Sequence, residues 1–500
     1  MYQSVIGLEI HIELNTKSKM FCSCRNDSLE RHPNINICPI CLGHPGTLPV
    51  INKEAVRKVI KTGLALNCQI PEYSQFNRKN YFYPDLPKGY QISQYDLPLC
   101  KGGFLMVGEK KIRIKRVHLE EDTAKLIHPP GRNFSLVDFN RAGIPLMELV
   151  TEPDISSAQE AKKFTQELRL ILRYLDVSEA DMEKGQLRIE ANVSLQRKSR
   201  KSKVESRNKL GTKVEIKNLN SLRAVEKAIE YEIKRQKEIL KEGKKVIQET
   251  RGWDDVKEIT VSQREKEQAQ DYRYFPEPDL PALQFSPKEI EEIKAGIPEL
   301  PYQKRERFKK EYGLEEKEIE VFIKWKELGE YFEKVLSELR NWIKESEQKP
   351  EVSEKEFKKL VNFSKNYLAV ELLGLLGEIK VDDKKFPITP ENFAEFIKLL
   401  YKGEISSKIA KAVLKEMFNR GADPSHIIAQ KGLSLISDEK TIEKAIKKII
   451  KKNQKAVEDF QKGKAKALQF LIGQVMRETR GRAHPEITRE VLTKILAQLK

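Results

Sequence analysis

The sequence predicts an α+β protein with a sheet-centred first part followed by helices. Alternation of apolar and polar residues, which is typical of half-buried strands, recurs up to about residue 290. Beyond that point apolar residues return at helical spacing, separated by lysine and glutamate. The 500 residues are enough for about three domains. We expect a sheet-centred domain at 1–290, a helical domain at 291–403 and a helical tail domain at 404–500.

The composition is typical of a globular protein with an anionic partner. Hydrophobic residues make up 39% of the chain, enough for real cores, and the formal net charge is +17. This charge favours nucleic acid as the partner, although a heat-tolerant surface rich in lysine and glutamate would be as basic. The chain opens without a signal-peptide pattern, and no apolar run approaches about 18 residues. We therefore expect a cytoplasmic protein without a membrane span.

The first strand is expected at Val5–Leu14, where one face is apolar and the other polar. The apolar face would consist of Ile6, Leu8, Ile10, Ile12 and Leu14. On the polar face, Glu9 and His11 are two residues apart and therefore side by side, with about 7 Å between their Cα atoms. Such a pair can bind a cation or exchange protons. Taken alone, it is more simply a solvated strand face.

Four of the six cysteines follow this strand as Cys-x-Cys and Cys-x-x-Cys, namely Cys22, Cys24, Cys38 and Cys41. Two close pairs of thiolates can surround one tetrahedral Zn²⁺, as in a zinc ribbon. A closed site of this kind would be structural and would pin the loop 25–37. The alternatives are reduced pairs, or disulfides of a thermophile's cytosol. Cys68 and Cys100 are isolated, and we interpret both as small core residues.

A proline-containing loop from Arg78 to Gln91 interleaves basic and aromatic residues. Its candidate binding residues are Arg78, Lys79, Tyr81 and Lys88. Aromatic rings stack on bases while cations pair with phosphates, so this loop suits a nucleotide or an unpaired RNA end. A packed aromatic loop is the alternative.

Further strands of the same sheet are predicted at 111–122, 135–140, 144–150, 187–195 and 213–217. Together with the first strand, three of them bring carboxylates to a polar face or to the strand end, namely Glu120, Glu121, Glu190 and Glu215. Glu148 and Glu152 add carboxylates near Asp154. Carboxylates on several strands indicate one shared cation and phosphate site on the sheet.

Basic residues lie close to these carboxylates in the sequence. Arg141 is in a predicted turn, Lys213 and Lys217 belong to the last predicted strand, and the loop Arg197–Lys209 suits phosphate contacts. Divalent cations and lysines are what phosphoryl transfer needs, because its transition state spreads negative charge over the transferred oxygens. The chain has no Gly-x-x-x-x-Gly-Lys-Ser/Thr motif, so an ATP site would not be a P-loop.

Several long motifs resemble the B subunits of the tRNA-dependent amidotransferases, which convert Glu-tRNA(Gln) or Asp-tRNA(Asn) into the amide form. The match runs nearly end to end. It includes Ile6–His11, Arg78–Gln91, His118–Asp122, Asn140-Arg141, Glu148, Glu152–Asp154, Lys217–Ser221, Asp271–Pro278 and Phe470–Met476. An archaeal glutamate-specific relative shares the front half but carries an inserted domain for which this chain is too short.

This resemblance implies a cradle domain with a kinase site, a helical domain and a YqeY-like tail domain that contacts tRNA. ATP and Mg²⁺ would serve to phosphorylate the side-chain carboxylate of the misacylated residue, and ammonia would then displace phosphate. Glu9, His11 and Glu121 match positions near the metal and are the first candidate magnesium ligands. Further catalytic candidates are Glu120, Glu190 and Glu215. Because Mg²⁺ prefers oxygen, His11 implies an intervening water or a site that also accepts Mn²⁺.

The candidates for binding ATP or the tRNA end are Arg78, Lys79, Tyr81, Lys88, Arg141, Lys213 and Lys217. The chain lacks a Gly/Ser-rich amidase signature, so it should not hydrolyse glutamine itself. The resemblance implies that ammonia comes from an amidase-type glutaminase A subunit, held together with this one by a small C subunit. An aminoacyl-tRNA synthetase for the same tRNA is a further candidate partner.

Two other classes of function remain open. The first is a non-catalytic zinc-ribbon adaptor that binds tRNA, in which the carboxylates would only be solvated. The second is a metal-dependent hydrolase of phosphate esters, which would turn over without ATP or aminoacylated tRNA.

Overall fold

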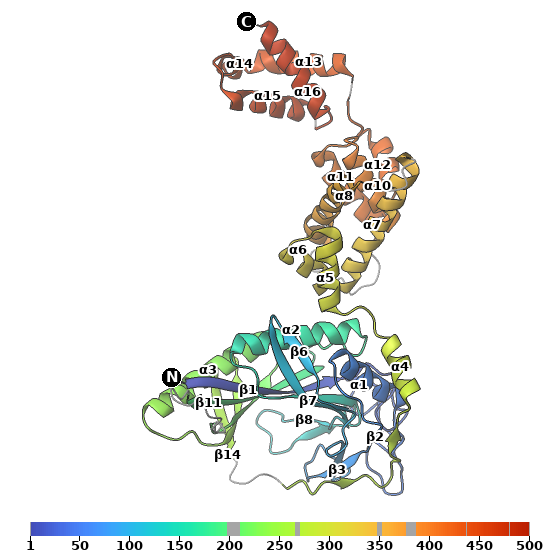
Figure 1. The fold of residues 1–500 in the computed structure, drawn as a ribbon, viewed down its shortest axis with the longest axis vertical. Coiled ribbons are helices and arrows are strands. Elements are labelled where there is room, and N and C mark those ends of the chain that lie inside the picture. The colour runs from blue at the N-terminus through green and yellow to red at the C-terminus, as the bar shows by residue number, and fades with distance from the viewer. Residues whose placement is uncertain are drawn as a thin grey trace. The chain divides into compact units, whose positions relative to one another are not determined.

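The computed structural model describes residues 2–197, 211–265, 271–347, 353–376, 387–436, 438–479 and 481–499. The chain divides into two compact units, Met1–Pro301 and Tyr302–Lys500. The first unit is built on a sheet and the second on helices, so the mixed α+β class is confirmed (Figure 1). The division into three domains stays a prediction.

The first unit contains a nine-stranded sheet with the order β14-β13-β12-β11-β1-β10-β7-β5, and β6 pairs with β7 off this path. β12 and β13 are parallel, and the other pairs are antiparallel. The strands are β1 (Tyr2–Glu13), β5 (Cys100–Lys101), β6 (Phe104–Val107), β7 (Lys110–Glu121), β10 (Pro145–Thr151), β11 (Leu187–Arg197), β12 (Val214–Leu219), β13 (Glu249–Asp254) and β14 (Ile259–Glu265).

One face of this sheet packs into the core of the unit. Helices α2 (Ala158–Tyr174) and α3 (Leu222–Lys241) lie side by side along it, and α1 (Lys53–Ala65) joins the same core (Figure 1). The five apolar residues predicted for the first strand have no exposed surface, which confirms its alternation. Burial of Cys68 and Cys100 confirms that both are core residues.

Ser157 and Glu160 have the spacing of a capping box at the start of α2, but only half of that motif is formed. The Ser157 hydroxyl accepts a hydrogen bond from the Glu160 backbone N–H. The Glu160 carboxylate instead accepts from the backbone and hydroxyl of Ser156. Ser156 offers two donors, so the glutamate satisfies both at once.

The prediction that residues 135–140 extend the main sheet is wrong. β9 (Leu136–Asp138) pairs with β8 (Lys125–Ile127) in a separate two-stranded sheet. A hydrogen bond between His128 Nδ1 and Ser135 Oγ, 2.8 Å long, links the segments next to it. Alternation identifies a strand but not its partner, and here the preceding strand in the chain is the partner.

Two more small sheets lie beside the main one. β3 (Asn77–Asn80) pairs with β4 (Tyr90–Ser93) and with β15 (Phe275–Pro276). β2 (Tyr73–Ser74) pairs with β16 (Leu283–Gln284), and helix α4 (Pro287–Ala295) follows. The predicted loop Arg78–Gln91 is therefore a hairpin whose ends are strands, joined to a segment nearly 200 residues away in sequence.

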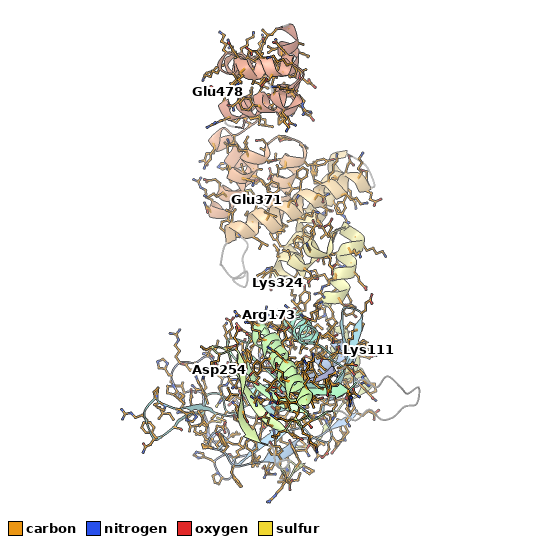
Figure 2. All side chains as sticks on the ribbon, turned by 90° about the vertical axis from the view of Figure 1, so that its left-hand side faces the viewer. Lys111, Arg173, Asp254, Lys324, Glu371 and Glu478 are labelled. Carbon is orange, nitrogen blue, oxygen red and sulfur yellow. The ribbon has the colours of Figure 1, made fainter. Side chains whose placement is uncertain are left out.

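The second unit is helical throughout its described part, as predicted. Its helices are α5 (Pro301–Tyr312), α6 (Glu316–Lys324), α7 (Lys326–Glu347), α8 (Glu354–Asn366), a π-helical turn (Tyr367–Leu372), α9 (Leu373–Leu376), α10 (Pro390–Tyr401), α11 (Ser407–Arg420), α12 (Pro424–Lys431), α13 (Glu439–Lys452), α14 (Gln454–Gln461), α15 (Ala465–Glu478) and α16 (Pro485–Gln498). Among the described residues, no helix is long and apolar enough to cross a membrane. In Figure 2, Arg173 and Asp254 mark the first unit, and Glu371 and Glu478 mark the second.

Candidate functional site

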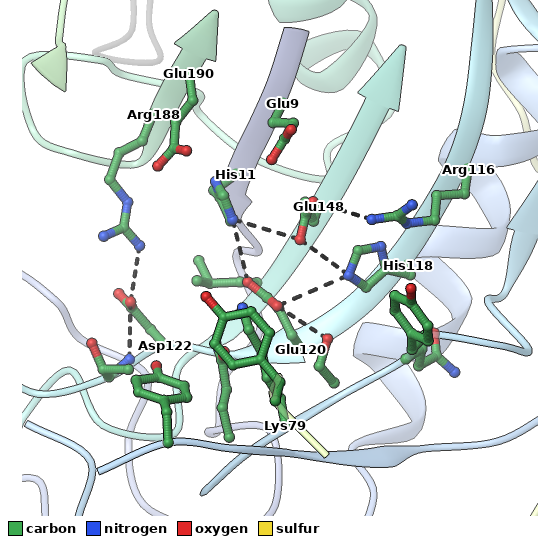
Figure 3. A pocket seen from close by; sticks show the side chains of 18 of the residues that line it. Glu9, His11, Lys79, Arg116, His118, Glu120, Asp122, Glu148, Arg188 and Glu190 are labelled. Carbon is green, nitrogen blue, oxygen red and sulfur yellow. Dashed lines mark hydrogen bonds and ion pairs between the residues drawn. The ribbon is translucent and has the colours of Figure 1, made fainter. Parts of the chain in front are cut away.

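Four neighbouring strands place one row of polar side chains directly opposite one another on the second face of the sheet. His118 on β7 is opposite Glu148 on β10, and Glu148 is opposite His11 on β1. His11 is in turn opposite Arg188 on β11. Residues opposite each other point to the same face, so the row follows from the register alone (Figure 3).

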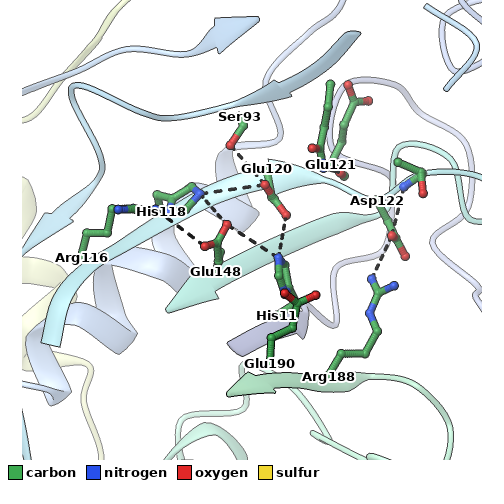
Figure 4. A network of polar contacts seen from close by, with 12 residues as sticks. His11, Ser93, Arg116, His118, Glu120, Glu121, Asp122, Glu148, Arg188 and Glu190 are labelled. Atoms are coloured by element: carbon green, nitrogen blue, oxygen red, sulfur yellow. Dashed lines mark hydrogen bonds and ion pairs between the residues drawn. The ribbon is translucent and has the colours of Figure 1, made fainter. Parts of the chain in front are cut away.

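The row forms an acidic cluster around two histidines, which Figure 4 shows. His11 Nε2 lies 3.5 Å from Glu120 Oε1 and 3.7 Å from Glu148 Oε2. His118 Nε2 lies 3.1 Å from Glu148 Oε2. Burial alone would raise the pKa of Glu148, but His118, His11 and Arg116 outweigh it and hold that pKa well below its usual range. Glu148 is therefore a carboxylate at neutral pH.

One ligand atom from each of His11, Glu120 and Glu148 lies within 4.8 Å of the others. This set of two carboxylates and one imidazole suits a divalent cation such as Mn²⁺, and it suits Mg²⁺ if the histidine acts through water.

A second acidic cluster consists of Glu9, Glu190 and Glu215, whose ligand atoms also lie within 4.8 Å of one another. Lys217 Nζ lies 3.0 Å from Glu190 Oε1. Burial would lower the pKa of Lys217, but Glu190 and Glu215 outweigh it and raise that pKa, so the ammonium stays charged. The second acidic cluster is therefore already paired with one cation of the chain, the Lys217 ammonium.

Asn192 supports this interpretation of the second cluster. Its Nδ2 donates a hydrogen bond of 2.8 Å to Glu9 Oε1. Its buried Oδ1 has no hydrogen-bond partner among the described residues. A buried carbonyl oxygen without a donor, next to three carboxylates, fits a site for a cation.

A wall of aromatic residues, formed by Tyr81, Tyr95, Tyr272 and Tyr274, faces the two clusters; we refer to it as the aromatic wall. Tyr95 and Tyr274 stack with their ring centroids 4.2 Å apart. Tyr272 contacts both Tyr81 and Tyr274 edge to face, at 6.0 Å. Burial raises the pKa values of Tyr81 and Tyr274. The rings of Tyr81 and Tyr274 are thus neutral and partly buried, whereas Tyr95 is 52% exposed.

The wall is held in place by the β3–β15 pairing. Asn80 donates from its backbone to Tyr272 O at 2.9 Å and from its side chain to Arg273 O at 2.8 Å. Arg273 has a φ of 47°, a left-handed conformation that directs the two tyrosines on either side of it. Lys79 Nζ lies 5.0 Å from the Tyr272 ring centroid.

Both clusters and the wall line one cavity of about 500 Å³ (Figure 3). The predicted residues that line it are Glu9, His11, Lys79, Tyr81, Glu120, Glu190, Glu215 and Lys217. The sheet and the β3–β4 hairpin thus bring together residues that are more than 200 positions apart.

Glu121, a first candidate magnesium ligand, does not line this cavity. Glu120 and Glu121 are consecutive on β7, so their side chains point to opposite faces. Glu121 forms an ion pair with Lys88 and accepts a hydrogen bond of 2.9 Å from the Ile92 backbone N–H. The structure therefore places Glu120 at the histidine cluster and uses Glu121 to anchor β4.

Four other predicted residues also lie outside the cavity lining, and one of them is Lys88, the partner of Glu121. Arg78 makes a bidentate pair with Glu277, with both bonds 2.8 Å long. Arg141 is bound to Asp122 at 2.7 Å. Lys213 is exposed, just before β12. The predicted basic loop 197–209 lies outside the described residues from position 198 onward.

Several cavity residues were not chosen from the sequence. Glu148, His118 and Arg188 carried a usable signal, because each alternates with apolar residues on a predicted strand. Asp122 carried a weaker signal, because it is the last residue of the predicted strand 111–122 and follows the end of β7. Burial would raise the pKa of Asp122, but Arg188 and Arg141 outweigh it and lower that pKa.

The four clustered cysteines also converge, with one sulfur from each within 4.8 Å of the others. The Cys38 backbone N–H donates to Cys41 Sγ at 3.1 Å, as in a metal-binding knuckle. A hydrogen bond from Cys22, helped by Lys19, lowers the pKa of Cys41 to about 5 despite its burial. A thiolate among four sulfurs fits a soft divalent cation such as Zn²⁺.

Hydrogen bonds from one asparagine also hold the loop 25–37. Asn140 accepts hydrogen bonds from the backbones of Ile35 and Asn36 at 2.8 and 2.9 Å, and donates to His32 O at 2.8 Å. One buried asparagine therefore satisfies three backbone groups of the loop.

Comparison with known proteins gives matches along most of the chain. A family model described as the GatB/GatE catalytic domain matches residues 4–291, and a second, described as the GatB domain, matches residues 351–496. The aspartyl/glutamyl-tRNA(Asn/Gln) amidotransferase B subunit of Thermotoga maritima is 48% identical over 507 residues, covering 99% of this chain and 99% of that protein. The B subunit of the same enzyme from Caldanaerobacter subterraneus subsp. tengcongensis is 47% identical over 501 residues, covering 99% and 100%. This chain therefore belongs to the family of aspartyl/glutamyl-tRNA(Asn/Gln) amidotransferase B subunits.

Proposed function

We propose that this chain uses ATP to phosphorylate the side-chain carboxylate of Glu-tRNA(Gln), Asp-tRNA(Asn) or both, and that ammonia then forms the amide. The observation that carries this proposal is the single cavity that holds two acidic clusters, a lysine and an aromatic wall. The names of the relatives supply the substrate class.

Each acidic cluster is a candidate site for a divalent cation. His11, Glu120 and Glu148 would hold one, and Glu9, Glu190 and Glu215 would hold another. When bound, Mg²⁺ supplies positive charge that offsets the charge on phosphoryl oxygens. Glu121, bound to Lys88, is not part of this proposal for the metal.

Lys79 is the candidate cation for the transferred phosphate. The other cations that line the cavity already face carboxylates: Arg116 faces Glu148, Arg188 faces Asp122, and Lys217 faces Glu190. In the described part of the chain, Lys79 has contacts with aromatic rings and no ion pair. Its charge is therefore available to an anionic substrate.

The proposed reaction has two steps. A carboxylate oxygen attacks the terminal phosphorus of ATP, the bond to the bridging oxygen breaks, and ADP leaves. Ammonia then attacks the carbonyl carbon of the acyl phosphate, the carbon–oxygen bond breaks, and phosphate leaves with the proton that nitrogen loses. The aromatic wall would keep water away from the acyl phosphate, which water otherwise hydrolyses.

The remaining expectations are proposals of the same kind. Ammonia would come from a glutaminase A subunit bound together with a small C subunit, and the four cysteines would hold a structural zinc ion. Lysines of α13 and α14 would contact the tRNA backbone, with the tail domain at 404–500 and the helical domain at 291–403 as separate domains.

The test is transfer of labelled γ-phosphate from ATP to Glu-tRNA(Gln) by the reassembled complex without an ammonia donor. Wild type is compared with Glu120→Gln and Lys79→Ala, and with the exposed controls Glu109→Gln and Lys115→Ala. We expect labelling that requires mischarged tRNA, that the first two variants lose and that the controls keep. Tight tRNA binding without labelling would favour the adaptor, and labelling unchanged in all variants would exclude this cavity.

A further inference from the structure

Lys19 is a lysine without exposed surface, located directly beside the four cysteines. Its Nζ lies 3.8 Å from Cys41 Sγ and donates a hydrogen bond of 3.2 Å to the carbonyl oxygen of Phe139. Among the described residues no carboxylate forms an ion pair with it. Moving an ammonium group out of water is strongly unfavourable unless an anion lies close to it.

The surroundings of Lys19 are shaped to keep it in this position. Its backbone N–H donates to Cys24 O at 2.9 Å, which fixes the start of the side chain beside the cysteine loop. Gly143 has a φ of 83°, and a Cβ there would lie 3.6 Å from both Lys19 Cδ and Cys41 Cβ. The Met20 backbone N–H donates to Gly143 O at 2.7 Å. The lysine therefore fills a fitted space between the cysteines and the 139–143 turn.

The charge of the metal centre explains why a cation belongs there. Four thiolates around one divalent cation carry a net charge of −2, whereas four neutral thiols carry none. A buried ammonium 3.8 Å from one sulfur offsets half of that charge and donates to the sulfur.

We propose that Lys19 is the built-in countercharge of the four-cysteine centre, so that a bound divalent cation and the buried ammonium stabilise each other. This inference rests on the proposed zinc site, and it assigns to that site a residue that is not a ligand. Through its hydrogen bond to Phe139, Lys19 also connects the four-cysteine centre to the turn that carries Asn140 and Arg141.

The first experiment measures metal affinity of the full chain, using Zn²⁺ in competition with a chelator and Co²⁺ as a spectroscopic probe. Wild type is compared with Lys19→Met, which keeps the length of the side chain without the charge, and with Lys17→Met at an exposed neighbouring position. We expect about 10- to 100-fold weaker binding in Lys19→Met, as for other partners just outside a ligand shell, and no change in Lys17→Met.

The second experiment separates charge from packing by thermal unfolding of the same proteins with and without zinc. We expect Lys19→Met to lower the unfolding temperature of the zinc-loaded chain, in which the centre carries a net charge of −2, more than that of the metal-free chain. An equal shift in both states would show a packing role only and overturn the inference. Wild type that binds no metal would overturn the zinc site itself, while equal binding by wild type and Lys19→Met would overturn the countercharge alone.

Discussion

At the scale of single residues, Glu148 connects the two histidines of the site. It lies opposite His11 on one side and His118 on the other, and Arg116 Nη2 approaches its second oxygen at 3.8 Å. Two imidazoles and a guanidinium keep this carboxylate ionised although it is buried. Its charge is thus fixed before any ligand binds, which is the preorganisation that an electrostatic site needs.

Replacing this carboxylate by its amide removes the charge with little change in shape. We expect Glu148→Gln to lower the apparent affinity for Mg²⁺ in the phosphorylation assay by at least about 100-fold, because both histidines and the cation lose their common anion. The measurement is a magnesium titration of phosphate transfer. The exposed Glu109→Gln is the control, and an unchanged titration in Glu148→Gln would remove the first cluster from the proposal.

A second residue-scale prediction concerns acid stability. Burial would raise the pKa of Glu333 on α7, but Arg307 and Lys304 outweigh it and lower that pKa from 4.5. A lowered carboxylate pKa contributes stability that is present above the pKa of the unfolded chain and disappears as the pH falls through the folded value. We expect wild type to resist urea better than Glu333→Gln at pH 7, because the ionised Glu333 stabilises the fold. This difference should disappear as the pH falls below 4.5. Glu330→Gln, an exposed position on the same helix, should match wild type at both pH values.

At the scale of elements, the sequence predicted strands better than their partners. The strand containing Glu9 and His11, and the strand containing Glu120, are where alternation placed them. The same alternation at 135–140 identified a strand that belongs to a different sheet. The β3–β15 pairing was missed because two-residue strands carry no period, and it is this pairing that positions Tyr272 and Tyr274.

Glu120 and Glu121 show where such prediction ends. Alternation with Val117 and Leu119 puts Glu120 on the polar face together with His118, whereas Glu121 was a first candidate only because it matches a family position near the metal. The two arginines on Asp122 lie in separate segments, so nothing local indicated that they meet.

The aromatic wall leads to a prediction about coupling. Tyr274→Ala removes a ring that stacks on Tyr95 and opens the cavity to water, so we expect more ATP hydrolysed for each amide formed. Tyr274→Phe keeps the ring and should keep the wild-type ratio. The measurement is phosphate released against Gln-tRNA(Gln) formed. An unchanged ratio in Tyr274→Ala would show that water is excluded by other means.

At the scale of the whole molecule, the family was predictable from long motifs, and the fold class from the spacing of apolar residues. Both signals are spread over the entire chain. The net charge of +17 belongs to this scale as well. Exposed lysines on α13 and α14, such as Lys451, Lys452 and Lys455, extend that charge over the tail. Lys447 and Lys448 on the same helix already form ion pairs with Glu443 and Glu478.

We expect the triple variant Lys451→Ala/Lys452→Ala/Lys455→Ala to bind tRNA more weakly and with a smaller dependence on salt. Each lost phosphate contact reduces the slope of log affinity against log salt by about one, so the slope should fall by about two to three. Lys447→Ala/Lys448→Ala is the control with paired lysines and should change the slope less. Equal slopes in wild type and the triple variant would place the tRNA contact elsewhere.

The central position of β1 has a consequence for synthesis of the chain. β1 leaves the ribosome before its two neighbours β10 and β11, and β11 ends only at Arg197. At about 5–20 residues per second, β1 waits roughly 10–40 s for its second neighbour. Both edges of this alternating, β-branched segment are open until β10 has emerged, and one edge is open until β11 has emerged. Open edges are the condition in which strands of different chains associate, so a nascent chain shorter than 197 residues exposes an edge that the folded protein covers.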